Sequence, residues 1–156
     1  MSMAIQKLLL DTNIILDFLL QREQQREQTR LLMLAGRVGE FSLWIASSQV
    51  TDLVYILTDG GKPNLVPEVL EKLRALRTFV NVCTVTDSDV DKMLATRWQD
   101  PEDALLVELA LKMKADAIIT RDKDFPETDL IRVHDCRGFF EWLGREKGIT
   151  YDEVPF

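Results

Sequence analysis

Four aspartates stand where a parallel β-sheet would bring their side chains together. Asp11 follows directly on one short apolar run and Asp122 on another, so each is placed to end a buried strand. Asp52 and Asp103 fall in the first turns of two predicted helices. Functional groups of open parallel sheets gather beyond the carboxyl ends of the strands, where loops and helix N-termini meet. We therefore expect all four carboxylates at one edge of one sheet.

Carboxylates gathered in this way repel one another, and some take up a proton unless a cation lies among them. Oxygen ligands suit Mg²⁺ or Mn²⁺, whose shells are completed by water and phosphate. Such a metal lowers the pKa of a bound water and stabilises charge on a phosphodiester. With one histidine, His134, and two cysteines, Cys83 and Cys136, the chain is poorly supplied with zinc ligands. The pattern predicts an oxygen-ligated site for Mg²⁺ or Mn²⁺.

Each acid also has a purely structural explanation. Asp52 and Asp103 could simply favour the dipole at the start of a helix. Asp122 and nearby Asp124 could be turn residues. Asp11 is harder to explain in this way, because a carboxylate among apolar neighbours is costly to bury without a partner. The metal hypothesis therefore depends on the four positions taken together.

The elements that would position these acids are those of an α/β fold. Short apolar runs alternate with helical patterns, without an internal linker or repeat, which favours a parallel sheet between helices. We expect one domain over residues 1–156, with about five parallel strands in a three-layer α/β/α arrangement. The predicted strands are residues 7–10, 41–46, 81–85, 117–120 and 130–133.

Helix signals separate these strands. Asp100, followed by proline and two further acids, is a strong helix start. Ser47 or Ser48 is suited to cap the helix after the second strand, and Gly36 and Gly39 are plausible helix stops. The helical patterns cover residues 14–20 and 31–38, then 48–57, 67–80, 87–98, 101–113 and 139–143.

The acids also lie in stretches that resemble a known family. The sequence LDTNIILD at residues 10–17 resembles the opening motif of the PIN-domain family. SSQVTDL at 47–53, PEDAL at 101–105 and ITRDKDF at 119–125 resemble its later motifs, in the same order. The resemblance runs over residues 7–133 and leaves 134–156 as a C-terminal helix and tail. Many members carry Glu where this chain has Asp52, whose shorter side chain would need a bridging water or a closer helix.

The resemblance implies a metal-dependent endoribonuclease that acts on single-stranded RNA and often forms homodimers. It extends to bacterial toxins of the VapC type, which a partner antitoxin neutralises. By position, the catalytic and metal-binding acids would be Asp11, Asp52, Asp103 and Asp122, with Mg²⁺ or Mn²⁺ as cofactor. The expected supporting residues are Thr12, Asn13, Ser48, Thr120 and Asp124.

The charge of the chain bears on RNA binding. A net charge of −7 is unusual for a protein that contacts phosphates, although a bound metal would cancel part of it. Three arginines recur every four residues and would form a basic stripe if residues 21–30 were helical. Glutamates interleave at the same spacing, so the alternative is a solvated face of paired charges. The candidate contacts to RNA or to an acidic partner are Arg22, Arg26, Arg30 and Arg121.

Three other functions fit part of the pattern. One is a PIN-fold module that has lost catalysis and serves in binding or assembly. The presence of Asp52, where many family members carry Glu, keeps this alternative open. A response-regulator receiver would need a phosphoacceptor Asp ending a central strand, which residues 81–85 lack. A phosphatase of the haloacid dehalogenase type would need two alternating Asp after the first strand, where residues 11–13 read DTN.

The sequence also predicts where the protein works. No apolar run approaches the ~20 residues that span a bilayer, and the early run is too short for a signal peptide. Two cysteines are too few to staple a domain of 156 residues. We therefore expect free thiols in a reducing cytosol and a cytoplasmic protein without a membrane segment.

Overall fold

A five-stranded parallel sheet forms the centre of the computed structural model, which describes residues 4–22 and 26–151. The strand order is β3-β2-β1-β4-β5, and every neighbouring pair is parallel. The five predicted strands are confirmed close to their expected bounds. They are β1 (Gln6–Leu10), β2 (Phe41–Ala46), β3 (Val80–Cys83), β4 (Ala117–Ile119) and β5 (Arg132–His134).

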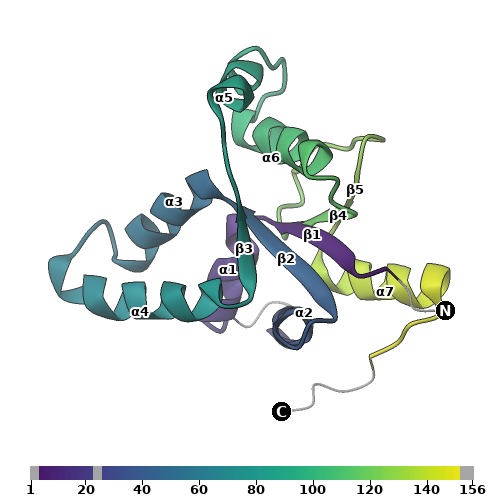
Figure 1. Cartoon of the computed structure of the whole chain (residues 1–156), viewed down its shortest axis with the longest axis horizontal. Coiled ribbons are helices and arrows are strands. Elements are labelled where there is room, and N and C mark those ends of the chain that lie inside the picture. The colour runs from purple at the N-terminus through teal and green to yellow at the C-terminus, as the bar shows by residue number, and fades with distance from the viewer. Residues whose placement is uncertain (1–3, 23–25, 152–156) are drawn as a thin grey trace.

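Helices cover both faces of this sheet (Figure 1). Helices α5 and α6 lie on one side, α1, α2 and α7 lie on the other, and α3 and α4 project as a pair from the left of the view. This is the three-layer α/β/α arrangement that the sequence predicts. The helices are α1 (Thr12–Leu19), α2 (Arg26–Arg37), α3 (Ser47–Leu57), α4 (Val66–Arg77), α5 (Asp87–Leu94), α6 (Pro101–Lys112) and α7 (Cys136–Lys147), with a 3-10 turn at Pro63–Leu65.

The apolar run of β1 explains why both faces are covered. Leu8 and Leu10 are fully buried in the cluster that includes α1, α2 and α7, whereas Leu9 is fully buried in the cluster formed with α6. Successive side chains of a strand point to opposite faces, so an unbroken apolar run needs a packed layer on each side. Within the described residues, no helix is long and apolar enough to cross a membrane. Cys83 and Cys136 are buried free thiols, as predicted.

Two of the predicted helix starts are confirmed, and one is corrected. Thr86 caps α5 by accepting the Asp89 N–H, and Asp100 caps α6. Helix α3 is different, because Ala46 occupies the N-cap position and has no side-chain acceptor. The Gln49 side chain instead accepts the Ala46 N–H at 2.6 Å.

The basic stripe depended on a helix over residues 21–30, and this condition is not met at Gln21 and Arg22. Helix α1 ends at Leu19, Gln21 has a positive φ of 51°, and α2 begins only at Arg26. Residues 23–25 lie outside the described part of the chain. The backbone N–H of Arg22 donates to the carbonyl of Asp17, which fixes a turn here. Arg22 therefore does not belong to a basic stripe, whereas Arg26 and Arg30 remain one turn apart on α2.

Gly36 has a different role from the predicted helix stop. It lies within the last turn of α2, where an added Cβ would stand 2.2 Å from Cδ1 of Leu43 on β2. Gly39, with φ of 90°, is the residue that carries the chain out of the helix. Gly36 thus permits the close approach of α2 to the sheet.

We expect Gly36→Ala to lower the free energy of unfolding by about 1–3 kcal/mol, because Leu43 is fully buried and has no room to retreat. Gly144→Ala in α7 is the matched control, since its new Cβ would meet atoms no nearer than 3.9 Å. That control should be neutral or slightly stabilising. Urea denaturation of both variants measures the difference, and equal values would contradict the close-packing role.

Candidate metal-binding site

The candidate site lies where the order of the strands reverses. The chain passes from β1 outward through β2 to β3 and then returns to place β4 on the other side of β1. The carboxyl ends of β1 and β4 therefore form a topological switch point, where open α/β sheets bind ligands. Asp11 follows β1 directly, and Thr120 and Asp122 follow β4.

Asp11 is held firmly at this position. It is the N-cap of α1, and its Oδ1 accepts the Thr12 N–H at 2.7 Å. Its Oδ2 accepts the Thr120 hydroxyl at 2.8 Å and the Asn13 amide at 3.4 Å. The Asp11 N–H donates to the Ile119 carbonyl at 2.9 Å. These contacts tie the carboxylate to both α1 and β4.

Asn13 and Thr120 extend the same network to the loop after β4. The Asn13 side chain contacts Thr120 Oγ1 at 3.3 Å, and its carbonyl oxygen accepts the Arg121 N–H at 3.0 Å. Thr120 Oγ1 also accepts the Asp122 N–H at 3.1 Å. Two of the residues predicted to support the site therefore fix the backbone that carries Asp122.

Asp103 lies in the first turn of α6 and is only 6% exposed. Its N–H donates to the Asp100 carboxylate at 3.2 Å. Burial, followed by the negative charges around it, raises the pKa of Asp103 to about 7. The charges that act in this direction belong to Asp100, Asp11, Asp122 and Glu102.

The pKa of Asp11 is raised as well. Burial is the largest cause, and the charges of Asp122 and Asp100 add to it. The hydrogen bonds from Thr120 and Thr12 act in the opposite direction, because they stabilise the ionised carboxylate. Two neighbouring carboxylates are thus both held in surroundings that disfavour their charge.

Asp52 lies at the exposed rim of this group, on the second turn of α3. It belongs to the same electrostatic environment, because its charge, after burial, raises the pKa of Glu102. The charges of Asp100 and Asp11 have the same effect on Glu102. Sequence reasoning treated Asp100 and Glu102 only as helix-start residues. The available signal was the density of acids, because three of the four residues at 100–103 are acidic.

The remaining predicted residues are placed less centrally. The Asp122 carboxylate accepts the Asp124 N–H at 2.9 Å, which closes a turn, and Asp124 itself is exposed. Ser48 is exposed at the start of α3. Among the described residues, no group of three or more Asp, Glu, His or Cys side chains converges closely enough to hold a metal ion. The acids are close enough for their charges to raise the pKa values of Asp11, Glu102 and Asp103, but in the described part of the chain they do not form a closed set of metal ligands.

An all-oxygen donor set of this kind still suits a hard divalent cation. Mg²⁺ keeps several waters and is commonly bound through one or two carboxylates together with substrate phosphates. A cation beside Asp11 and Asp103 would remove the conflict that raises the pKa of both groups. The residues present therefore fit such an ion.

Sequence reasoning missed the ion pair between Asp17 and Arg121. The Asp17 side chain is 1% exposed and receives Arg121 Nε at 2.6 Å and Nη2 at 3.2 Å. Arg22 reaches the same carboxylate at 3.4 Å. Arg121, a candidate contact to RNA or a partner, also fastens the loop carrying Asp122 to α1 through this ion pair. Asp17 is the last residue of the opening motif, which was the available signal.

Gln49 is a second positioning residue that the sequence did not reveal. It is 5% exposed, and its amide donates to the Leu10 carbonyl at 2.9 Å and to the Thr12 hydroxyl at 3.2 Å. Its carbonyl oxygen accepts from Ala46, as described above. One side chain therefore sets the start of α3, and with it Asp52, against the end of β1.

We expect Arg121→Gln to lower the free energy of unfolding by about 2 kcal/mol, because the buried Asp17 carboxylate loses its two-pronged partner. Adding Asp17→Asn to this variant should recover part of the loss, since no buried charge then remains. Lys123→Gln, at an exposed position on the same loop, is the control. Chemical denaturation of these variants would contradict the account if Arg121→Gln matched the control.

The model of the PIN domain matches residues 7–124, well over half of the chain. Among solved structures, a chain of VapBC2 from Rickettsia felis, in a complex with a DNA fragment from the promoter, superposes with a TM-score of 0.62 at 15% identity. The match covers 83% of this chain and 98% of that one. At that identity the likeness shows the fold alone. The curated proteins provide no match.

Proposed function

Because the chain belongs to the PIN-domain family, we propose that it is a Mg²⁺- or Mn²⁺-dependent endoribonuclease that hydrolyses phosphodiester bonds in single-stranded RNA. The observation that carries this proposal is the buried Asp103 carboxylate, whose pKa is raised to about 7 by burial and by four other carboxylates. A cation bound among these carboxylates would offset the cost of their burial and mutual repulsion.

Asp11 and Asp103 are the residues that would hold the ion most directly. Asp11 already accepts three hydrogen bonds, which leave about one of its four lone-pair directions free, so its orientation toward a ligand is fixed. Asp122 and Asp52, at the edges of the site, would act through water, and the short side chain of Asp52 suits that role. A bound divalent ion supplies a nucleophilic water and stabilises charge on the phosphate.

The direct test is cleavage of single-stranded RNA by the purified chain. A labelled oligoribonucleotide of mixed sequence is incubated with Mg²⁺, with Mn²⁺ or with EDTA, and the same sequence annealed as a duplex serves as the control. We expect metal-dependent internal cleavage of the single strand. Cleavage that persists unchanged in EDTA would overturn the proposed chemistry.

The second candidate is a catalytically silent PIN-fold module. It is favoured by the exposed, shortened acid at Asp52 and by the absence of a closed ligand group among the described residues. This candidate predicts an intact fold, no RNA cleavage with either metal, and no measurable affinity for Mn²⁺.

We further propose that the enzyme is the toxin of a toxin–antitoxin pair, acting in the cytoplasm as a homodimer that an antitoxin protein inhibits. The support is the family together with the likeness of the fold to VapBC2. Arg26 and Arg30 on α2 are candidate contacts to RNA or to the acidic side chains of such a partner. Expression of the chain should arrest bacterial growth, and expression of the Asp11→Asn variant should not.

A further inference from the structure

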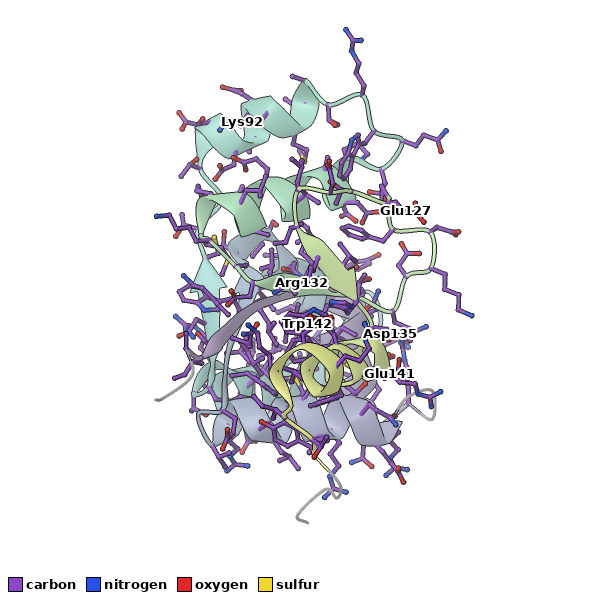
Figure 2. The ribbon with its side chains drawn as sticks, turned by 90° about the vertical axis from the view of Figure 1, so that its right-hand side faces the viewer. Lys92, Glu127, Arg132, Asp135, Glu141 and Trp142 are labelled. Atoms are coloured by element: carbon purple, nitrogen blue, oxygen red, sulfur yellow. The ribbon has the colours of Figure 1, made fainter. Side chains whose placement is uncertain are left out.

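A cavity of about 490 Å³ lies next to the acids, on the β5 side of the site. Its walls come from the end of β4, the loop of residues 121–131 and β5. Figure 2 looks onto this side, with Glu127 on the loop, Arg132 on the strand and Asp135 below them. Thr120 and Asp122 line the cavity and also belong to the candidate metal site. The two sites therefore share one stretch of backbone.

The lining of the cavity combines apolar surface with polar groups. Phe125 and Ile131 are buried at 8% and 9% exposure and are part of the core cluster beneath. Thr128 and His134 supply polar atoms, and the charged lining residues are of both signs. A cavity with balanced charge and apolar walls favours an uncharged planar group over a free anion. Its volume lies within the range of small-molecule sites.

His134 adds a second observation. Its ring packs near Phe139 and Trp142, with centroids 6.4 Å and 6.1 Å away, and its Nε2 is buried without a hydrogen-bond partner in the described part of the chain. Burial, followed by the charge of Arg132, lowers the pKa of His134. The ring of His134 therefore packs against α7, and His134 forms part of the cavity wall at the end of β5.

We propose that this cavity receives one unpaired base of the RNA substrate, next to the phosphodiester held at the acids. The inference rests on the proposed function. Single-stranded RNA is recognised through splayed bases that stack on apolar or aromatic side chains and hydrogen bond at their edges. The faces of the base would lie against Phe125 and Ile131, and its edge would lie toward the hydroxyl group of Thr128. Because Asp122 borders both sites, a nucleotide flanking the cleaved bond is the one placed to enter.

The test is a series of single-stranded RNA oligonucleotides in which each nucleotide flanking the cleavage point is made abasic in turn. We expect one position at which loss of the base lowers kcat/KM about tenfold, with little effect at the others. A flat profile in an enzyme that does cleave the intact RNA would overturn the inference. Because the series uses the unaltered protein, its result does not depend on the folding of a variant.

A filled cavity provides the complementary measurement. Thr128→Trp should slow cleavage of the intact RNA about tenfold and remove the sensitivity to the abasic position. Leu130→Trp, which is on the same loop but is 59% exposed and does not line the cavity, should retain the original profile. Retention of the abasic effect in Thr128→Trp would place the base elsewhere.

Failure of the proposed function is distinguishable from failure of this inference. If the intact RNA is not cleaved with either metal, the same oligonucleotides are compared by fluorescence anisotropy for binding to the unaltered chain. A position-specific loss of affinity that Thr128→Trp abolishes would support the base site and overturn only the nuclease. Equal affinities throughout the series would overturn the base site as well.

Discussion

Replacing Asp11 with asparagine is expected to lower the rate of RNA cleavage by about a thousandfold or more, since several kcal/mol of transition-state stabilisation depend on the metal that it helps to hold. Asparagine has nearly the same shape, but it removes one negative charge. Whichever way the asparagine amide is turned, its N–H₂ group faces another donor. That donor is the Thr12 N–H in one orientation and the Asn13 amide in the other. The Thr120 hydroxyl can rotate to accept, so the loss of stability should stay near about 1 kcal/mol.

The measurement is single-turnover cleavage of a labelled single-stranded RNA in saturating Mn²⁺, with circular dichroism to establish that the fold is retained. Asp91→Asn removes the same charge from an exposed position on α5 and is the matched control. It should cleave at the unaltered rate. Full activity in Asp11→Asn would exclude the carboxylate from the chemistry.

Asp103→Asn is expected to stabilise the metal-free protein at pH 8, by up to about 4 kcal/mol if the whole shift of the pKa from 3.8 to about 7 reflects the folded state. The carboxylate is buried among other acids, so its ionised form is disfavoured only when the chain is folded. Asparagine keeps the shape and removes the charge, and therefore relieves both burial and repulsion.

The pH dependence has a definite sign. Since the pKa of Asp103 is raised on folding, the unfolded chain loses its proton first, and the folded state is destabilised as the pH rises. The contribution of Asp103 to the free energy of unfolding should fall between about pH 4 and pH 7 and then level off. Asp11 and Glu102, whose pKa values are also raised, contribute in the same direction.

Urea denaturation in EDTA at intervals from pH 4 to pH 8 measures this effect. The decline should be distinctly smaller in Asp103→Asn than in the unaltered protein, and Asp91→Asn should follow the unaltered curve. Adding Mn²⁺ at pH 8 should stabilise the unaltered protein more than Asp103→Asn, because a ligand that binds only the folded state raises its stability. Parallel curves for the two proteins in EDTA would contradict the electrostatic account of the site.

The parts of the fold that depend on local pattern were predictable. An unbroken run such as Leu8–Leu9–Leu10 is buried on both faces only in a covered parallel sheet, and the sequence around Asp100 and Pro101 defines a helix start without any tertiary information. The gathering of the acids at one edge follows from the strand-end rule, because β1 and β4 are neighbours.

The contacts that were not predictable join residues far apart in the chain. Arg121 and Asp17 are separated by 104 positions, and nothing local to either one indicates the other. Gly36 has the appearance of a helix stop until the close approach of Leu43 is known. The periodicity of the arginines at 22, 26 and 30 gave no sign of the turn that Gln21 and Arg22 make against Asp17, so the condition for a basic stripe could not be judged from the sequence.

The central claim is that Asp11 and Asp103 hold a divalent cation, and Mn²⁺ titration of the metal-free chain by calorimetry at pH 7 tests it most directly. The account predicts saturable binding accompanied by proton release, because the raised pKa of Asp103 leaves part of that carboxyl protonated until the metal displaces the proton. Asp91→Asn should bind as the unaltered chain does, and both Asp11→Asn and Asp103→Asn should lose at least about tenfold in affinity. An absence of Mn²⁺ binding, or binding undiminished in both site variants, would contradict the account.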